Sequence, residues 1–360
     1  MQRENIQHLL VIRADADGVI GSGHVMRCLA LAQEWRRQGG EVVFWGRIGT
    51  ESLRERIMAE GCRLRTLQAS YPDPMDLVEV SDWLHEKKTQ PGWLVLDGYH
   101  FDAVYHDAIR ATGWSLLVID DCAHLPEYQA DILLNPNAYA EELPYKTKPD
   151  TLQLLGPRYA PLRREFFEVD KQCREVVGNG RRILVTMGGA DPDNVSGRVV
   201  DAIWAMNRGD LEVKIVIGSL NPNHADLTAR LAGKPFAAEL QAPVTAMVPL
   251  MQWADLAVSA AGSTCLELAA LGVPMVVTVL ANNQELMAAS LATHKVARNL
   301  GWFHDWQPTQ AAAILQELLN DQEQCRQMGE KGRSLVDGKG CGRVIAMMHS
   351  WRGDVCEYKK

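Results

Sequence analysis

The sequence predicts two α/β domains, each built on a doubly wound parallel sheet. Short runs rich in Val, Ile and Leu recur along the chain, and each is followed by a turn and a helical pattern. Such continuous apolar runs are typical of strands covered on both faces, as in parallel sheets. The chain has 360 residues, more than one hydrophobic core usually supports, so two domains are expected.

Eight runs predict the strands, four in each half of the chain. They are HLLVIRAD, EVVFWG, WLVLDG and SLLVIDD, followed by RILVTMGG, LEVKIVIG, DLAVSA and PMVVTVL. A charged, irregular stretch that ends in Gly178, Asn179 and Gly180 separates the two groups and is typical of a linker. We therefore predict a Rossmann-like domain over 1–165, a linker over 166–180, a second Rossmann-like domain over 181–345, and a C-terminal helix or tail over 346–360 that packs back on the first domain.

Composition and charge narrow the class of protein. With 47% hydrophobic and 23% charged residues, the chain is neither disordered nor fibrous. The net charge of -8 and the lack of a Lys/Arg run argue against nucleic acid as a partner, although helix N-termini can still hold an anion. The most apolar stretch, 266–281, is interrupted by Gly272 and Pro274, so it is too short to span a bilayer. We expect a cytoplasmic protein without a membrane partner, and the sequence leaves the oligomeric state open, a monomer included.

The eight cysteines predict neither disulfides nor a metal site. They form no C-x-x-C pair and no Cys/His spacing that resembles a zinc site. We expect them to be reduced and mostly buried. No metal and no cofactor are therefore expected.

The loop after the first predicted strand has the composition of a ligand site. Gly21 and Gly23 permit positive φ and a close approach of a ligand to the backbone, but the dinucleotide fingerprint G-x-G-x-x-G fails at Met26. His24 lies in the first turn of the following helix, where an imidazole that titrates near neutrality suits a general base. The alternative is that His24 only bonds a neighbouring loop, and the glycine context favours catalysis.

Charged residues near this loop are candidates for a supporting role. Arg13 and Asp15, at the tip of the first strand, are expected to orient His24 or to contact substrate. The alternative for both is a salt bridge that ties the loop. Arg27, from the same helix as His24, is included among the substrate-binding candidates.

Two more strand ends in the first half carry polar residues. Asp97 and Tyr99 could hydrogen-bond a sugar or hold a catalytic histidine, and the alternatives are helix capping by Asp97 and packing by Tyr99. Asp120 and Asp121 are adjacent, and neighbouring residues on a strand point to opposite faces. We therefore favour a structural role for this acidic pair over a shared metal or glycosidase site.

The second half contains two glycine turns that could hold a diphosphate. Gly188 and Gly189 follow a strand, and backbone amides of a glycine turn next to a helix N-terminus stabilise phosphate. Asp191 nearby would oppose this or act as the N-cap. The later turn is more specific: Ser263 and Thr264 open a helix and could hold the diphosphate.

Glu267, about one turn into that later helix, could accept both hydroxyls of a ribose. The alternative is a capping-box partner of Thr264, since T-x-x-E is the required spacing, and we favour binding. The remaining substrate-binding candidates of this half are Ser259, Gly262 and Asn283.

These motifs resemble a known family, the UDP-2,4-diacetamido-2,4,6-trideoxy-β-L-altropyranose hydrolases of pseudaminic acid biosynthesis. The matching stretches are IRADADGVIGSGHVMRCLALA, VLDGYHFD, VIDD, ADILLNPN, LLGPRYAPLRREF, VTMGGADPDN, SAAGSTCLELAALGVP and ANNQ. The second half alone also resembles nucleotide-sugar glycosyltransferases of the two-Rossmann-domain type. The resemblance implies a glycosyltransferase-B-like fold whose two domains face a cleft and bind a UDP-sugar.

The resemblance also implies roles for individual residues. His24 matches the general base, and Tyr99, the second catalytic candidate, matches an aromatic residue near the sugar. Ser263, Thr264 and Glu267 match the nucleotide-binding loop and helix. Asn283 matches an Asn that follows the next strand. The implied reaction is attack of water on the anomeric carbon with inversion, which releases UDP and a free diacetamido sugar without a metal.

Three other functions fit parts of the pattern. A glycosyltransferase of the same fold would need an acceptor site and commonly an apolar or basic membrane-facing patch, which the first half lacks. A hydrolysing UDP-sugar 2-epimerase would use carboxylates near C2 in place of one histidine. A binding module without chemistry would retain its UDP-sugar affinity after the substitution His24→Ala and would turn nothing over.

Overall fold

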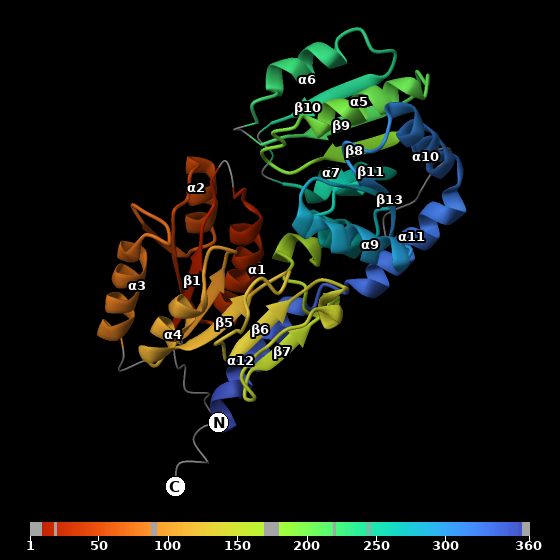
Figure 1. Ribbon diagram of the computed structural model, residues 1–360. Coiled ribbons are helices and arrows are strands. Elements are labelled where there is room, and N and C mark those ends of the chain that lie inside the picture. The colour runs from red at the N-terminus through yellow and green to blue at the C-terminus, as the bar shows by residue number, and fades with distance from the viewer. Residues whose placement is uncertain are drawn as a thin grey trace. The chain divides into compact units, whose positions relative to one another are not determined.

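Figure 1 shows the computed structural model of the protein, which describes residues 9–17, 20–87, 92–168, 180–218, 221–242, 244 and 246–354, with the backbone alone for 352–354. The chain forms two units, Met1–Arg164 with Gly338–Lys360, and Glu165–Asp337. Each unit contains one parallel sheet with helices, so the predicted pair of doubly wound α/β domains is confirmed. Most of the expected linker, 169–179 with Gly178 and Asn179, lies outside the described residues.

The first unit has a seven-stranded sheet with the order β3-β2-β1-β4-β5-β6-β7. Its strands are β1 (Leu9–Ala14), β2 (Glu41–Gly46), β3 (Arg63–Thr66), β4 (Trp93–Asp97), β5 (Ser115–Ile119), β6 (Ile132–Asn135) and β7 (Leu152–Leu155). Its helices are α1 (Gly23–Arg37), α2 (Glu51–Ala59), α3 (Pro74–Glu86), α4 (Ala103–Ala111) and α12 (Gly340–Asp354), with short 3-10 turns at Ala140–Glu142, Pro157–Tyr159 and, at the boundary, Arg164–Phe166. The order reverses between β1 and β4, and ligands of open α/β sheets bind at the carboxyl ends of strands where the order reverses.

Apolar side chains cover both faces of this sheet because successive residues of a strand point to opposite sides. On β1, Leu10 and Ile12 belong to the core shared with α1 and α12. Val11 belongs to the core shared with α3 and α4. A strand buried on both faces needs an unbroken apolar run, which is why β1 has one.

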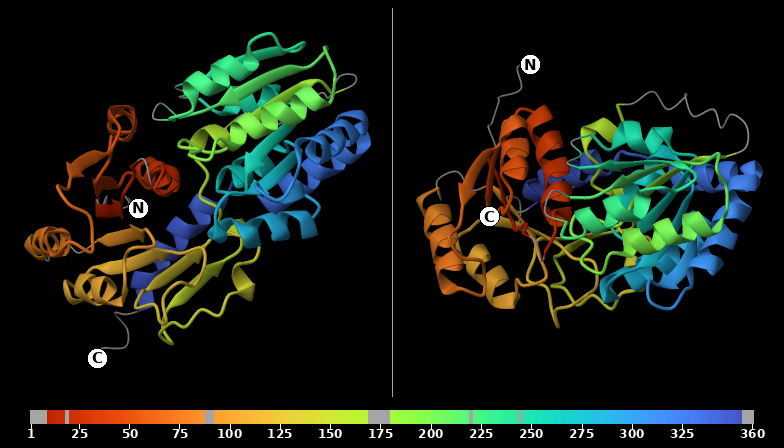
Figure 2. Two further views of the ribbon diagram at one scale, coloured as in Figure 1. Left: turned by 45° about the horizontal axis from the view of Figure 1, so that its top comes forward. Right: turned by 90° about the horizontal axis from the view of Figure 1, so that it is seen from above.

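The last helix, α12, packs against α1 of the first unit (Figures 1 and 2). Val344, Ile345 and Met348 are fully buried in the shared core. The chain rejoins the first unit at Gly338, so the expected end of the second domain at 345 is wrong by several residues. The physical reason is that the helix that completes this core already begins at Gly340. It approaches the first unit closely there, because a Cβ at Gly340 would lie 2.1 Å from the carbonyl oxygen of Ala160.

The second unit has a six-stranded parallel sheet with the order β10-β9-β8-β11-β12-β13. Its strands are β8 (Arg182–Thr186), β9 (Glu212–Val216), β10 (Ala237–Gln241), β11 (Leu256–Ala260), β12 (Met275–Val279) and β13 (Ala297–Trp302). Its helices are α5 (Val195–Ala205), α6 (His224–Leu231), α7 (Val248–Trp253), α8 (Thr264–Leu271), α9 (Glu285–Thr293), α10 (Pro308–Asn320) and α11 (Gln322–Leu335), with a 3-10 turn η4 (Asn282–Gln284). The central strands β11 and β12 are buried throughout.

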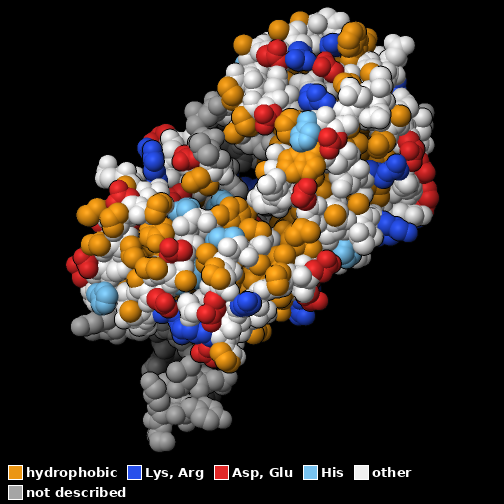
Figure 3. All heavy atoms as spheres, viewed as in Figure 1, with side chains coloured by type: hydrophobic (Ala, Val, Ile, Leu, Met, Phe, Trp, Pro, Cys, Tyr) orange, Lys and Arg blue, Asp and Glu red, His pale blue; other side chains and the backbone are white. Residues whose placement is uncertain are grey.

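The surface carries charges of both signs. On the face drawn in Figure 3, Lys and Arg side chains are scattered among Asp and Glu and form no extended basic patch. Among the residues that the structure describes, no helix combines the length and the apolar character needed to cross a membrane.

His106 of α4 is a buried titratable group in the first unit, 1% exposed. Its Nδ1 has no hydrogen-bond partner among the described residues, and burial lowers its pKa to about 4. In the unfolded chain the pKa of this histidine is about 6.5. The unfolded state therefore binds more protons than the folded state between pH 6.5 and 4. The free energy of unfolding should therefore fall as the pH drops through that window, by up to about 3 kcal/mol.

The substitution His106→Gln tests this origin of acid lability, because glutamine stays neutral at every pH. Urea unfolding at pH 7 and pH 4.5 should show a smaller loss of stability for the variant than for the unsubstituted protein. Equal losses in the two proteins would assign the acid lability to other groups.

Candidate active site

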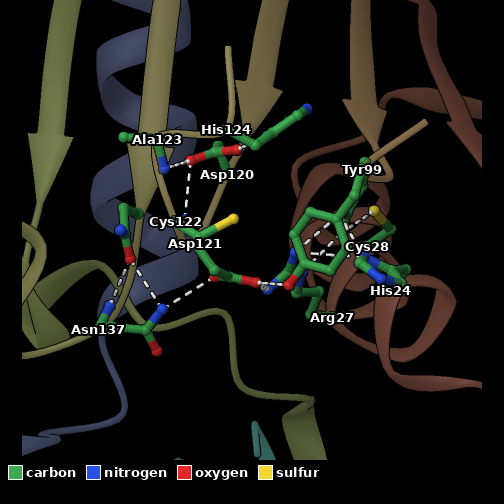
Figure 4. Close-up of polar contacts among 12 residues, drawn as sticks. His24, Arg27, Cys28, Tyr99, Asp120, Asp121, Cys122, Ala123, His124 and Asn137 are labelled. Atoms are coloured by element: carbon green, nitrogen blue, oxygen red, sulfur yellow. Dashed lines mark hydrogen bonds and ion pairs between the residues drawn. The ribbon is translucent and has the colours of Figure 1, made fainter. Parts of the chain in front are cut away.

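Polar side chains of the first unit gather at the carboxyl ends of β1, β4 and β5 (Figure 4). They come from the N-terminal turn of α1, from the end of β4 and the loop after it, and from the loop after β5. This edge lies beside the reversal of strand order between β1 and β4, where a ligand site is expected.

His24 is the second residue of α1 and half-buried, and its Nδ1 lies 2.7 Å from Oδ1 of the fully buried Asp97. An ionised carboxylate only accepts hydrogen bonds, so Nδ1 carries the proton and Nε2 keeps its lone pair. An imidazole oriented in this way can act as a general base through Nε2. In the turn before it, Gly21 has a φ of 75° with open space at its Cβ position, and Gly23 begins the helix.

Arg27 joins two buried carboxylates. Its Nε and Nη2 donate to Asp97 at 2.6 and 2.7 Å, and its Nη1 donates to both oxygens of Asp121 at 2.9 and 2.7 Å. Although burial alone would raise the pKa of Asp97, the Arg27 guanidinium and His24 hold it well below its usual range. Arg27 was expected to bind substrate, and in the structure its guanidinium is paired with these two carboxylates.

Asp121 closes a circuit of contacts around His24. Besides Arg27, its carboxylate accepts from the Tyr99 hydroxyl at 2.8 Å and from Asn137 Nδ2 at 2.9 Å. The Tyr99 ring in turn packs edge-on against the His24 ring, with centroids 5.1 Å apart. The sequence analysis gave Asp121 a structural role and did not name Asn137, so both residues are additions to the site.

Asp120 points away from this circuit, as the alternation of neighbouring residues predicts (Figure 4). Its Oδ1 accepts from the backbone N–H groups of Cys122 and Ala123 and from the Tyr145 hydroxyl, and its Oδ2 makes a short contact with His124 Nδ1. Although burial would lower the pKa of His124, its hydrogen bond to Asp120 raises it to about 10, so His124 is a cation at neutral pH.

Asp120, Cys122 and His124 also have ligand atoms within 4.8 Å of one another, a spacing that a metal could bridge. The sequence showed no such cluster because this D-x-C-x-H pattern is not one of the common zinc spacings. The carboxylate is already saturated by amides, a hydroxyl and His124, and a metal would have to displace the tightly held proton of His124. We therefore interpret the cluster as a hydrogen-bonded support behind Tyr99, whose ring lies 5.8 Å from that of His124.

Arg13 and Asp15 form a separate buried network. The two side chains make a paired salt bridge at 2.6 and 2.9 Å, Arg13 also contacts Asp76, and Asp15 lies 3.1 Å from His100 Nε2. No contact joins either residue to His24 among the described residues. The structural alternative, a salt bridge that ties the loop, therefore describes this pair, and neither residue orients His24.

In the second unit, the N-terminus of α8 offers unpaired backbone amides. Ser263 is the N-cap and its side chain makes no capping hydrogen bond. The backbone N–H groups of Ser263 and Thr264 meet no protein acceptor among the described residues, and a Cβ at Gly262 would meet no atom within 4 Å. Because Ser263 caps the helix, Glu267 stands one position beyond the capping-box spacing, which disfavours the capping interpretation.

The N-terminus of α5, the other glycine turn, is closed by side chains. Asp191 accepts from the backbone N–H groups of Val195 and Ser196 at 2.8 and 3.0 Å. Gly188 and Gly189 before it are exposed, but the helix amides behind them are occupied. This turn is thus a weaker anion site than the start of α8.

Two other candidates of the second unit differ in exposure. Ser259 is fully buried in β11, and its hydroxyl donates to the carbonyl of Ala260, so it is not presented to a ligand. Asn283 is exposed in η4, which follows β12.

The chain is similar to several known proteins. Residues 182–338 match the model of the glycosyltransferase family 28 C-terminal domain. An uncharacterized protein of Methanocaldococcus jannaschii is 24% identical over 97% of this chain and 74% of its own length. The spore coat polysaccharide biosynthesis protein SpsG of Bacillus subtilis is 29% identical over 54% of this chain and 57% of its own. A UDP-2,4-diacetamido-2,4,6-trideoxy-beta-L-altropyranose hydrolase of Campylobacter jejuni is 27% identical over 59% of this chain and 71% of its own.

Solved structures share the fold across nearly the whole chain. MurG of Acinetobacter baumannii has a TM-score of 0.66 at 16% identity and covers 96% of this chain and 99% of its own. An assigned UDP-N-acetylglucosamine 2-epimerase of Listeria monocytogenes has a TM-score of 0.63 at 14% identity, with 96% of each chain covered. With the matched domain and the two parallel sheets, these findings support a GT-B-like enzyme that uses nucleotide sugars.

Proposed function

We propose that the protein hydrolyses a UDP-sugar at the anomeric carbon, releasing UDP and a free 2,4-diacetamido-2,4,6-trideoxyhexose for nonulosonic (pseudaminic) acid biosynthesis in the cytoplasm. The observation that carries the proposal is the contact of His24 Nδ1 with Asp97 at 2.7 Å, which leaves Nε2 free to take a proton. The similarity to the Campylobacter jejuni hydrolase supports the choice of substrate.

In the proposed reaction, His24 Nε2 removes a proton from water while the water oxygen bonds to the anomeric carbon. The bond between that carbon and the phosphate oxygen breaks, and the electron pair leaves with UDP. Attack opposite the leaving group inverts the anomeric configuration. Because a diphosphate is a good leaving group when backbone amides stabilise its charge, one base is sufficient and the step needs no metal.

The start of α8 is the proposed place for the diphosphate. Its free amides at Ser263 and Thr264 and the positive end of the helix dipole favour an anion there. The half-buried Glu267 on the same helix and the exposed Asn283 are proposed to contact the nucleoside or the sugar.

A glycosyltransferase is the second candidate, because the matched domain model is a glycosyltransferase domain. In that function, His24 would take the proton of an acceptor hydroxyl in place of water. A hydrolysing 2-epimerase is a third candidate, since one neighbour of the same fold is assigned that activity.

Labelled water separates hydrolysis at the anomeric carbon from attack at phosphorus, and the need for an acceptor separates hydrolysis from transfer; an epimerase is recognised by a product sugar that is inverted at C2. The purified protein is incubated with UDP-2,4-diacetamido-2,4,6-trideoxyhexoses in ¹⁸O-water, and UDP and sugar are followed by mass spectrometry. Hydrolysis at the anomeric carbon should place the label in the sugar. Label in UDP would mean attack at phosphorus and would exclude the mechanism, whereas no release without an added acceptor would favour a transferase.

The glycine turn that holds the diphosphate can be identified with two matched substitutions. Gly262→Ala adds a methyl group where the chain leaves open space, so the fold should tolerate it but the diphosphate should not. We expect UDP affinity to fall by about ten-fold or more in calorimetric titration. Gly189→Ala is the control, because it also meets open space but lies before the occupied amides of α5. Loss of affinity only in the control would move the diphosphate to α5.

A further inference from the structure

Asp121 is the residue through which the parts of the proposed site are connected. It is the second residue after β5, and its side chain is 12% exposed. Three donors reach its carboxylate: the guanidinium of Arg27, the hydroxyl of Tyr99 and the amide of Asn137. Arg27 also donates to Asp97, the hydrogen-bond partner of His24. The Tyr99 ring packs against the His24 ring (Figure 4).

We propose that Asp121 is a positioning residue for His24, acting through Arg27 on one side and through Tyr99 on the other. The proposal rests on the proposed function of His24 as a base, and it concerns a residue to which the sequence pattern gave only a structural role. Asp121 does not touch His24, so its effect must pass through the two side chains that it holds.

The first path is the orientation of Arg27. Its Nη1 is held by Asp121, while its Nε and Nη2 hold Asp97. Nη2 also lies 3.3 Å from His24 Nδ1, where both groups compete for the same Asp97 oxygen. Without the anchor at Nη1, the guanidinium is free to move towards that oxygen and to displace the imidazole.

The second path is charge. The groups that face His24 are Asp97 from β4, Arg27 from its own helix and Tyr99 from the loop after β4, with Asp121 behind them. Further out, Cys28 contacts Asp97, and the cationic His124 packs on the far side of Tyr99. Two carboxylates and one guanidinium carry a net charge of about -1 while His24 is neutral, so the cluster becomes neutral when His24 takes a proton. Without the Asp121 charge, the cluster is neutral before His24 takes a proton and positive afterwards, so protonation of His24 is less favourable.

The experiment compares three variants by two measurements. Asp121→Asn keeps the shape and removes the charge, Tyr99→Phe removes only the hydroxyl contact, and Asp107→Asn removes an exposed carboxylate of α4 as a control. The titration of the His24 imidazole is followed by NMR, which needs no turnover, and UDP-sugar hydrolysis is followed by kcat against pH.

For Asp121→Asn we expect the NMR titration of His24 to move to lower pH and kcat to fall by about ten-fold or more, with the pH profile displaced in the same direction. Tyr99→Phe should lower kcat without moving the titration of His24, and Asp107→Asn should change neither. An unchanged His24 titration together with an unchanged kcat in Asp121→Asn overturns the proposal. A shifted titration in a protein that hydrolyses nothing keeps the positioning role and rejects the proposed function.

A variant that fails to fold does not leave the question open. Asp121→Glu restores the charge at a displaced position, and Asn137→Ala keeps the charge but removes one contact that fixes it. Both should leave the His24 titration near that of the unsubstituted protein while kcat falls. Unchanged kcat in these two variants contradicts positioning by Asp121.

Discussion

Replacing His24 by alanine is expected to lower kcat for UDP release by about two to four orders of magnitude. The His24 imidazole can accept a proton through Nε2, because its Nδ1 is hydrogen-bonded to Asp97. UDP affinity should be retained, since the proposed diphosphate contacts lie on α8 in the other unit. Initial rates of UDP release and calorimetric titration with UDP measure the two effects separately.

A matched histidine gives the control for this substitution. His85 lies on α3, is exposed and contacts only the backbone carbonyl of Ser81 among the described residues, so His85→Ala should retain full activity. Full activity in His24→Ala would remove His24 from the mechanism and would leave a water molecule or another group to act as base.

Asp97→Asn is expected to lower kcat by about a hundred-fold or more while the fold is retained. An asparagine can turn its NH₂ group towards Nδ1, which then becomes the acceptor and leaves the proton on Nε2, where it blocks base catalysis. A carboxylate that orients a catalytic histidine has an effect of this kind in the serine-protease triad. Steady-state kinetics, with circular dichroism to verify folding, measure the effect.

Asp15→Asn separates orientation of the base from general stability. Asp15 is also buried at a strand end and also contacts an arginine and a histidine, but it does not touch His24. Asp15→Asn and Asp97→Asn should both lower the melting temperature, because each removes a buried charge from a hydrogen-bonded network. If Asp15→Asn lowered kcat as much as Asp97→Asn, the loss would reflect damage to the strand ends rather than orientation of His24.

The strands that the sequence predicted are those with continuous apolar runs. All eight occur, and the central ones are buried on both faces. The five others carry weaker patterns for physical reasons. The edge strands β3 and β10 are mostly exposed and contain charges, β6 and β7 have four residues each, and β13 includes Arg298 and Asn299. Strands with a solvated side need no apolar run, and the run of the buried β6, Ile132 to Leu134, is only three residues long.

The site was predicted where a strand end and a glycine turn coincided, which applies to His24, Asp97 and Tyr99. The three-residue spacing of Arg27 from His24 on one helix predicts that the two side chains are neighbours, but nothing in the local sequence shows that Arg27 pairs with Asp97 and Asp121. Adjacent residues at a strand end point to different faces, so the pair Asp120 and Asp121 does not by itself indicate that Asp121 faces His24. The rule that strand ends share one edge of a sheet could have found it.

The return of α12 to the first unit has a consequence for how the protein is made. Residues 165–337 form a unit of their own, inserted into a domain whose apolar face on α1 is completed by Val344, Ile345 and Met348. During translation, all of the inserted unit is therefore synthesised before the first unit can complete its core. Until α12 is synthesised, the first unit keeps an uncovered apolar surface, so removal of this helix should leave an aggregation-prone N-terminal half even though the second unit is intact.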